Sequence, residues 1–168
     1  MKTNPDVRLV QLAHEAGFLA EAISPLEVNK ALEVGFTPEQ VILNGPGKWW
    51  HKEYLPKEPM HAVFCDSVAD LKRVVAAMEM GELKTKIAGV RLRTPNIPSR
   101  FGIPIDTPEV FNTLIESIGM LPHDNQFGVH FHMGRAVMSE SSSGGIFLNQ
   151  SCVGAVQSKH CQDALLKF

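Results

Sequence analysis

Segments with apolar residues at helical spacing alternate along the chain with short apolar runs. Four segments carry the helical pattern, at 4–17, 24–35, 67–80 and 107–119. The second is the most clearly marked, because Ser24 is a candidate N-cap, Pro25 suits the first helical position and Glu27 completes a capping box. Gly17, Gly35 and Gly119 are expected to close their helices.

Five runs of strand length lie between or beside these helices, and most are rich in Val, Ile or Phe. They cover 18–23, 40–44, 61–65, 87–93 and 127–133. Strands that alternate with capped helices predict β/α units around a parallel sheet. Periodicity alone does not separate a barrel from a doubly wound sheet. Because no G-x-G-x-x-G motif follows a strand, we favour a TIM-type (β/α) barrel over a dinucleotide-binding fold.

The last thirty residues, from Ser139 to Phe168, are polar and small and show no clear period. A loop followed by a poorly specified terminal segment is the simplest interpretation. We therefore expect residues 1–138 to form the barrel domain and residues 139–168 to form a tail.

Composition and charge exclude several classes of protein. The formal net charge is -2, without a basic cluster, so we expect no nucleic-acid partner. No apolar run approaches the roughly 20 residues of a membrane helix, and no signal-peptide pattern follows Met1, so we expect no membrane partner. The three cysteines lack zinc spacing, which fits reduced thiols in a cytoplasmic protein.

Candidate functional residues lie where the predicted strands end, because parallel barrels place their sites there. These polar positions are Lys2, Glu21, Asn44, Asp66, Arg93 and His132. They predict a polar ring at one mouth of an otherwise apolar set of strands.

Arg91 and Arg93 share one face of their strand, and a buried arginine face requires an anionic partner. An internal salt bridge to Asp or Glu and a bound anion both satisfy this requirement. His130 and His132 likewise share a face, where they could bind a metal or form hydrogen bonds with neighbouring residues. The G-P-G-K loop at 45–48 could hold an anion, although such short glycine patterns are common in turns.

Several motifs, in this order and at these spacings, resemble one known family. They are K-T-N at 2–4, A-E-A-I-S at 20–24, N-G-P-G-K at 44–48, S-R-F-G at 99–102 and H-F-H-M-G at 130–134. Together they resemble the pyridoxal-phosphate-binding barrel domain of the ornithine/diaminopimelate/arginine decarboxylases, which have the alanine-racemase-like fold type III. The resemblance runs from Met1 to about Ala136.

The resemblance implies a role for each matching residue. Lys2 would form the Schiff base with pyridoxal 5'-phosphate, and His132 would stack on its ring. Arg93 would lie near the ring or the phosphate, and Glu21 would match an acidic residue beside the lysine. Lys2 and His132 are the implied catalytic residues, and an amino acid is the implied substrate.

The chain also departs from the family pattern. Arg135 stands where the family usually has a phosphate-binding serine, and a guanidinium could take over part of that contact. Gly144-Gly145 comes too early to match the family's phosphate-binding glycine triplet. The resemblance implies a barrel cut short at both ends, with about six of eight strands.

Two functions remain open on these residues. The first is a decarboxylase of the basic amino acid or diaminopimelate class, in polyamine or lysine metabolism. The second is a non-catalytic homologue that binds the cofactor or another protein. In either case we expect a homo-oligomer or pairing with a full-length homologue, or partial covering of the open edge of the sheet by the tail at 139–168. We also expect weak cofactor binding through Lys2 and no appreciable decarboxylation by this chain alone.

Overall fold

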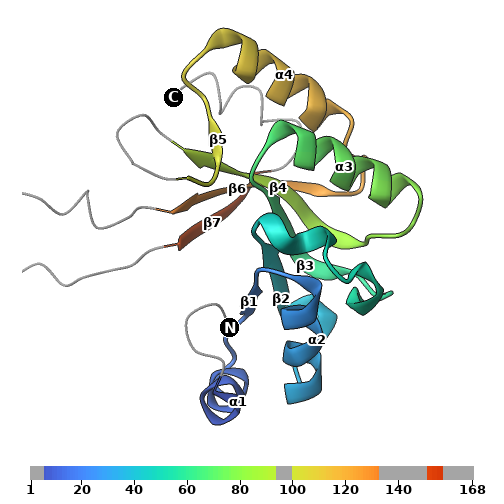
Figure 1. Cartoon of the computed structure of the whole chain (residues 1–168), viewed down its shortest axis with the longest axis vertical. Helices are drawn as coiled ribbons and strands as arrows, with labels where there is room; N and C mark the ends of the chain where they lie inside the picture. Colours follow the sequence, from blue (N-terminus) through green and yellow to red (C-terminus); the bar gives the residue numbers. More distant parts are fainter. Residues whose placement is uncertain (1–5, 94–99, 133–150, 157–168) are drawn as a thin grey trace, which may run out of the picture.

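The strands form one sheet, in a computed structural model that describes residues 6–93, 100–132 and 151–156. The strands are β1 (Ala20–Ala22), β2 (Val41–Asn44), β3 (Met60–Cys65), β4 (Thr85–Arg93), β5 (Ile103–Pro104), β6 (Gln126–His132) and β7 (Ser151–Val156). Their order is β1-β2-β3-β4-β6-β7, and the short β5 pairs with β4 (Figure 1). The pairs from β1 to β6 are all parallel. The expected parallel sheet in sequence order is confirmed.

All four predicted helices are present. They are α1 (Val7–Glu15), α2 (Pro25–Val34), α3 (Val68–Glu79) and α4 (Pro108–Gly119). At the start of α2 the Ser24 side chain accepts a hydrogen bond from the backbone N–H of Glu27. The Glu27 carboxylate accepts from the backbone N–H of Ile23, one residue before the position that a capping box uses.

The three helix ends that glycine was expected to mark agree with the sequence. Gly17 and Gly35 follow α1 and α2 with positive φ angles of 78° and 118°, which glycine adopts without strain. Gly119 was expected to close its helix, and α4 ends at this residue. It is the last residue of α4, and the C-cap is Met120 in an ordinary right-handed conformation.

Three 3-10 helices that the sequence did not predict lie in the connections on either side of β2. They are η1 (Pro38–Gln40), η2 (Pro46–Trp49) and η3 (Lys52–Tyr54).

The two faces of the sheet differ. One face packs against the helices and forms the main core, which includes Val28 and Ala31 of α2, Leu71 and Val74 of α3, and Leu114 of α4. Figure 1 shows α2, α3 and α4 following the same side of the sheet. The opposite face, called the inner face here, carries the alternate strand residues and a small apolar cluster of Ile42, Ala62, Phe64 and Ile87. Helices on one face only are typical of a barrel and not of a doubly wound sheet.

A side-chain contact shows that the sheet curves strongly toward the inner face. Asn44 on β2 and His130 on β6 are separated by β3 and β4. In a flat sheet, three strand spacings of about 4.8 Å would put the backbones of the two residues about 14 Å apart, with their side chains parallel. Yet Nδ2 of Asn44 lies 3.4 Å from Nδ1 of His130. The described strands therefore form an incomplete TIM-type (β/α) barrel.

The C-terminal tail contributes a strand that we did not expect. β7 pairs with β6 in the antiparallel direction, with Phe127 opposite Val156 and His132 opposite Ser151. It thus covers the outer edge of the last parallel strand, the kind of edge that otherwise invites pairing with another chain. No regular alternation of apolar and polar residues predicted this strand, because its sequence, S-C-V-G-A-V, is short and contains glycine.

Candidate functional site

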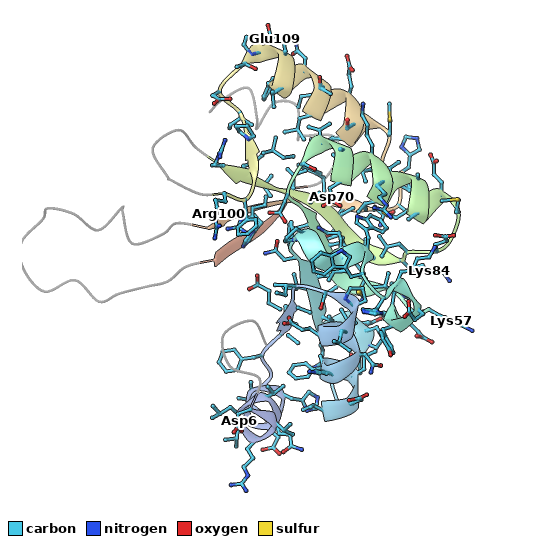
Figure 2. All side chains as sticks on the ribbon, viewed as in Figure 1. Asp6, Lys57, Asp70, Lys84, Arg100 and Glu109 are labelled. Atoms are coloured by element: carbon cyan, nitrogen blue, oxygen red, sulfur yellow. The ribbon has the colours of Figure 1, made fainter. Side chains whose placement is uncertain are left out.

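The polar residues of the inner face gather at the carboxyl ends of the strands. The first inner layer is apolar, with Ile42, Ala62 and Ile87 paired across neighbouring strands. Further toward the carboxyl ends of β4 and β6, beyond Ile87 and Gly89 on the same face, Arg91 lies opposite His130. Figure 2 shows which end of the sheet carries the carboxyl ends of the strands. Lys57 and Lys84, which precede β3 and β4, lie at one end, and Arg100, which follows β4, lies at the other.

Glu21, Asn44 and His130 form a chain of hydrogen bonds across this polar end. Nδ2 of Asn44 donates to Oε1 of Glu21 over 2.9 Å and lies 3.4 Å from Nδ1 of His130. Asn44 and His130 are only 3% and 2% exposed. The Phe64 ring lies 5.4 Å from the His130 ring and covers this chain from the apolar side. Three residues from three separate strands are thus held together, with Asn44 and His130 buried and Glu21 half-buried.

Arg91 has an internal partner. Its Nη1 lies 3.7 Å from Oδ1 of Asp66, the residue that follows β3, and both side chains are largely buried. Its guanidinium also lies 5.5 Å from the centre of the Phe101 ring. Of the two possibilities that the sequence left open for Arg91, the structure shows the internal salt bridge.

Arg93 occupies the last position of β4, one pleat beyond Arg91 on the same face. It is half-buried, whereas Arg91 is buried. Arg93 is therefore the more accessible of the two guanidinium groups and the better placed to meet a ligand at the mouth of the sheet.

The G-P-G-K loop does not present its lysine to an anion. Lys48 is 2% exposed, and its Nζ donates to the carbonyl oxygen of Gly45 and to Oδ2 of Asp70 at 2.7 Å. Nε1 of Trp49 donates to the other oxygen of Asp70. This ion pair ties the loop after β2 to the first turn of α3. It therefore fixes the backbone immediately after Asn44.

The expected site residues are described to different extents. Glu21 and Arg93 lie at the polar end of the inner face, as predicted. His132 is the last residue of β6. Lys2 and Arg135 lie outside the described residues.

Two further expectations concern metals and membranes. Among the described residues, no group of three or more His, Cys, Asp or Glu side chains is arranged to hold a metal ion. Among the described helices, none combines the length and apolar character that a membrane span requires.

Cys65 faces the helices on the other side of β3, and burial raises the pKa of its thiol above the usual range.

The sequence placed Asn44 and Asp66 in the polar ring and His130 on the same strand as His132. It did not predict that Asn44 contacts His130 or that Asp66 pairs with Arg91. The available signal was strand alternation, which puts Asn44, Arg91 and His130 on the same face as Glu21 and Arg93. Their contact depends on the curvature of the sheet, and alternation carries no information about that.

Residues 1–144 match a family model described as "Pyridoxal-dependent decarboxylase, pyridoxal binding domain". The chain belongs to this family. The match covers most of the chain and includes every residue of the polar end of the inner face.

The relatives that the chain matches include proteins named as diaminopimelate and ornithine decarboxylases. A rice protein named "Probable diaminopimelate decarboxylase, chloroplastic" is 31% identical over 150 residues, which cover 82% of this chain and 30% of the rice protein. Ornithine decarboxylase of Saccharomyces cerevisiae is 23% identical over 137 residues, covering 80% of this chain and 28% of the yeast enzyme. The chain thus spans about a third of the length of these relatives.

Solved structures agree on the fold. Diaminopimelate decarboxylase of M. jannaschii superposes with a TM-score of 0.61 at 20% identity, over 78% of this chain and 33% of that enzyme. Ornithine decarboxylase of Entamoeba histolytica gives 0.55 at 24% identity, over 79% and 35%. These likenesses support the barrel architecture that the curvature of the sheet indicates.

The described residues fit pyridoxal phosphate, the cofactor of this family. The cofactor is anionic and aromatic and carries hydrogen-bond donors, so it requires a cation, an apolar wall and acceptors. Arg93 offers a half-buried cation, and Glu21 offers a carboxylate in the same region. Oδ1 of Asn44 is a buried acceptor that has no hydrogen-bond partner among the described residues.

Proposed function

We propose that this chain binds pyridoxal phosphate at the polar end of its inner face and serves amino-acid decarboxylation. The observation that carries the proposal is the hydrogen-bonded assembly of the half-buried Glu21 with the buried Asn44 and His130. It lies beside Arg91 and Arg93 in a curved sheet of the pyridoxal-binding family. The names of the relatives support diaminopimelate or a basic amino acid such as ornithine as the substrate class.

Each site residue would contribute a simple interaction. Arg93 would neutralise negative charge on the cofactor, and Arg135 would supply a second guanidinium for the phosphate. His132 would pack against the ring, Glu21 would hold a proton or an adjacent cation in place, and Lys2 would attach the cofactor. When bound, the cofactor supplies an electron sink for the carbon that loses carbon dioxide. The protein would orient the substrate and exclude water around that carbon.

Assembly and location belong to the same proposal. Several large apolar side chains at and just after α1 are exposed, and exposed apolar surface often marks an interface. They are Val7, Leu9, Leu12, Phe18 and Leu19. They support association with a second copy or with a full-length homologue. The proposed location is the cytoplasm, which the cysteine content of the sequence favours.

The role of Arg93 can be tested by cofactor binding. Arg93→Ala is expected to weaken pyridoxal phosphate binding at least about tenfold, because a charge-assisted hydrogen bond is worth roughly 1.5–3 kcal/mol. Titration of the chain with the cofactor, followed by visible absorbance, measures the affinity. The matched control is Arg100→Ala, which removes an exposed arginine near the same end of the sheet. Equal effects of the two substitutions would reject a specific role for Arg93.

A further inference from the structure

We propose that Asn44 is a positioning residue that couples Glu21 to His130 and fixes which nitrogen of the His130 imidazole carries the proton. The inference rests on the proposed function only where it takes Glu21 to be a cofactor-binding residue. The coupling itself is a property of the chain without cofactor.

The two amide hydrogens of Asn44 serve two different acceptors. An ionised carboxylate only accepts hydrogen bonds, so the NH2 group of Asn44 must face Oε1 of Glu21, 2.9 Å away. The second hydrogen of the same NH2 group is then directed to Nδ1 of His130, 3.4 Å away. Nδ1 can accept this bond only if it carries no proton. A neutral His130 must therefore carry its proton on Nε2 and act as a donor there.

Burial of the Asn44 amide carries a free-energy cost. Asn44 is 3% exposed, and its Oδ1 has no hydrogen-bond partner among the described residues. An apolar side chain of similar size would avoid this desolvation cost, because a buried acceptor without a partner is destabilising. The cost of burying Oδ1 is thus associated with an NH2 group that lies between the Glu21 carboxylate and the His130 imidazole.

The surroundings hold Asn44 and His130 in place. Gly45, the next residue, has a φ of 136°, and Lys48 donates to its carbonyl while bound to Asp70. On the other side, Arg91 lies directly opposite His130 in the β4–β6 register and pairs with Asp66. These contacts fix the backbone on both sides of the Asn44–His130 contact.

The test is the tautomer of His130 in the cofactor-free chain. Long-range proton–nitrogen NMR correlations on the ¹⁵N-labelled protein, above the usual pKa of histidine, distinguish the two tautomers, and His130→Gln identifies the resonances. The wild-type chain is expected to show the Nε2–H form. Asn44→Leu removes the donor and is expected to shift the ring toward a mixture. Glu21→Leu is expected to do the same from a distance, because the Asn44 amide can then turn its oxygen to Nδ1.

Asn29→Leu is the matched control. Nδ2 of Asn29 donates to Oε1 of Glu33 over 2.7 Å on the exposed side of α2, so an equivalent bond is lost away from the site. It should leave the His130 tautomer and cofactor binding unchanged. Asn44→Leu should weaken pyridoxal phosphate binding about tenfold, because Glu21 loses the hydrogen bond that holds its carboxylate in place.

The inference is overturned if wild-type His130 carries its proton on Nδ1, or if Glu21→Leu leaves the tautomer unchanged. The second result decides the matter even if Asn44→Leu fails to fold. A chain that shows the expected tautomer and coupling but does not bind pyridoxal phosphate would contradict the proposed function and leave the coupling standing.

Discussion

Asp70→Leu is expected to lower the free energy of unfolding by about 3–5 kcal/mol, the usual cost of leaving one member of a buried ion pair without its partner. The ammonium group of Lys48 is almost inaccessible to water and lies 2.7 Å from Oδ2 of Asp70. Without that carboxylate, its only other described hydrogen bond is to the carbonyl of Gly45. The indole of Trp49 loses its acceptor in the same substitution.

Urea denaturation followed by far-UV circular dichroism measures this effect. The control is Glu82→Leu, which breaks the Lys52–Glu82 pair at 3.2 Å, where both side chains are about half exposed. Such exposed pairs contribute only about 0–1 kcal/mol. Similar losses in the two variants would show that the buried pair has no special weight. A large loss confined to Asp70→Leu would show that it anchors the loop behind Asn44.

Gly89→Ala is expected to destabilise the chain by about 3 kcal/mol, at the upper end of the usual cost of overpacking. A Cβ at Gly89 would collide with the backbone carbonyl of Gly128 on β6 and lie 2.9 Å from the Phe64 ring. Backbone cannot move aside as a flexible side chain can. The two glycines thus leave space for Phe64 inside the curve of the sheet, just before Arg91 and His130.

Gly119→Ala provides the comparison for this substitution. Gly119 lies in α4, and a Cβ there meets nothing within 4 Å. Alanine should therefore stabilise the helix by about 0.5–1 kcal/mol. Thermal unfolding of both variants, with opposite shifts in midpoint, is the expected result. If Gly89→Ala unfolds at the wild-type temperature, the inner face is less tightly packed than the contacts imply.

The sequence predicted those features that depend on neighbouring residues. Ser24 and Pro25 start α2 and Gly35 ends it, because capping and positive φ are local requirements. The parallel order of the strands followed from their alternation with helices. Glu21 and Arg93 were placed in the polar ring because each lies at or near the end of a predicted strand.

Features that depend on distant contacts were not predictable in this way. The G-P-G-K loop was considered as an anion site, yet its lysine is paired with Asp70, 22 positions away. The antiparallel β7 depends on an available edge of β6 and not on a strong strand pattern of its own. The link from Glu21 through Asn44 to His130 depends on curvature, which the glycines of β4 and β6 permit.

The most direct test of the central claim is to fix the cofactor to the chain and find where it is attached. The chain is incubated with pyridoxal phosphate, reduced with borohydride, digested, and its modified lysine identified by mass spectrometry. We predict that Lys2 carries the cofactor, that Lys2→Ala abolishes specific labelling, and that Lys84→Ala, which removes an exposed lysine before β4, does not. Labelling spread over many lysines and unchanged by Lys2→Ala would contradict the assignment of this chain as a pyridoxal-phosphate-binding domain attached through Lys2.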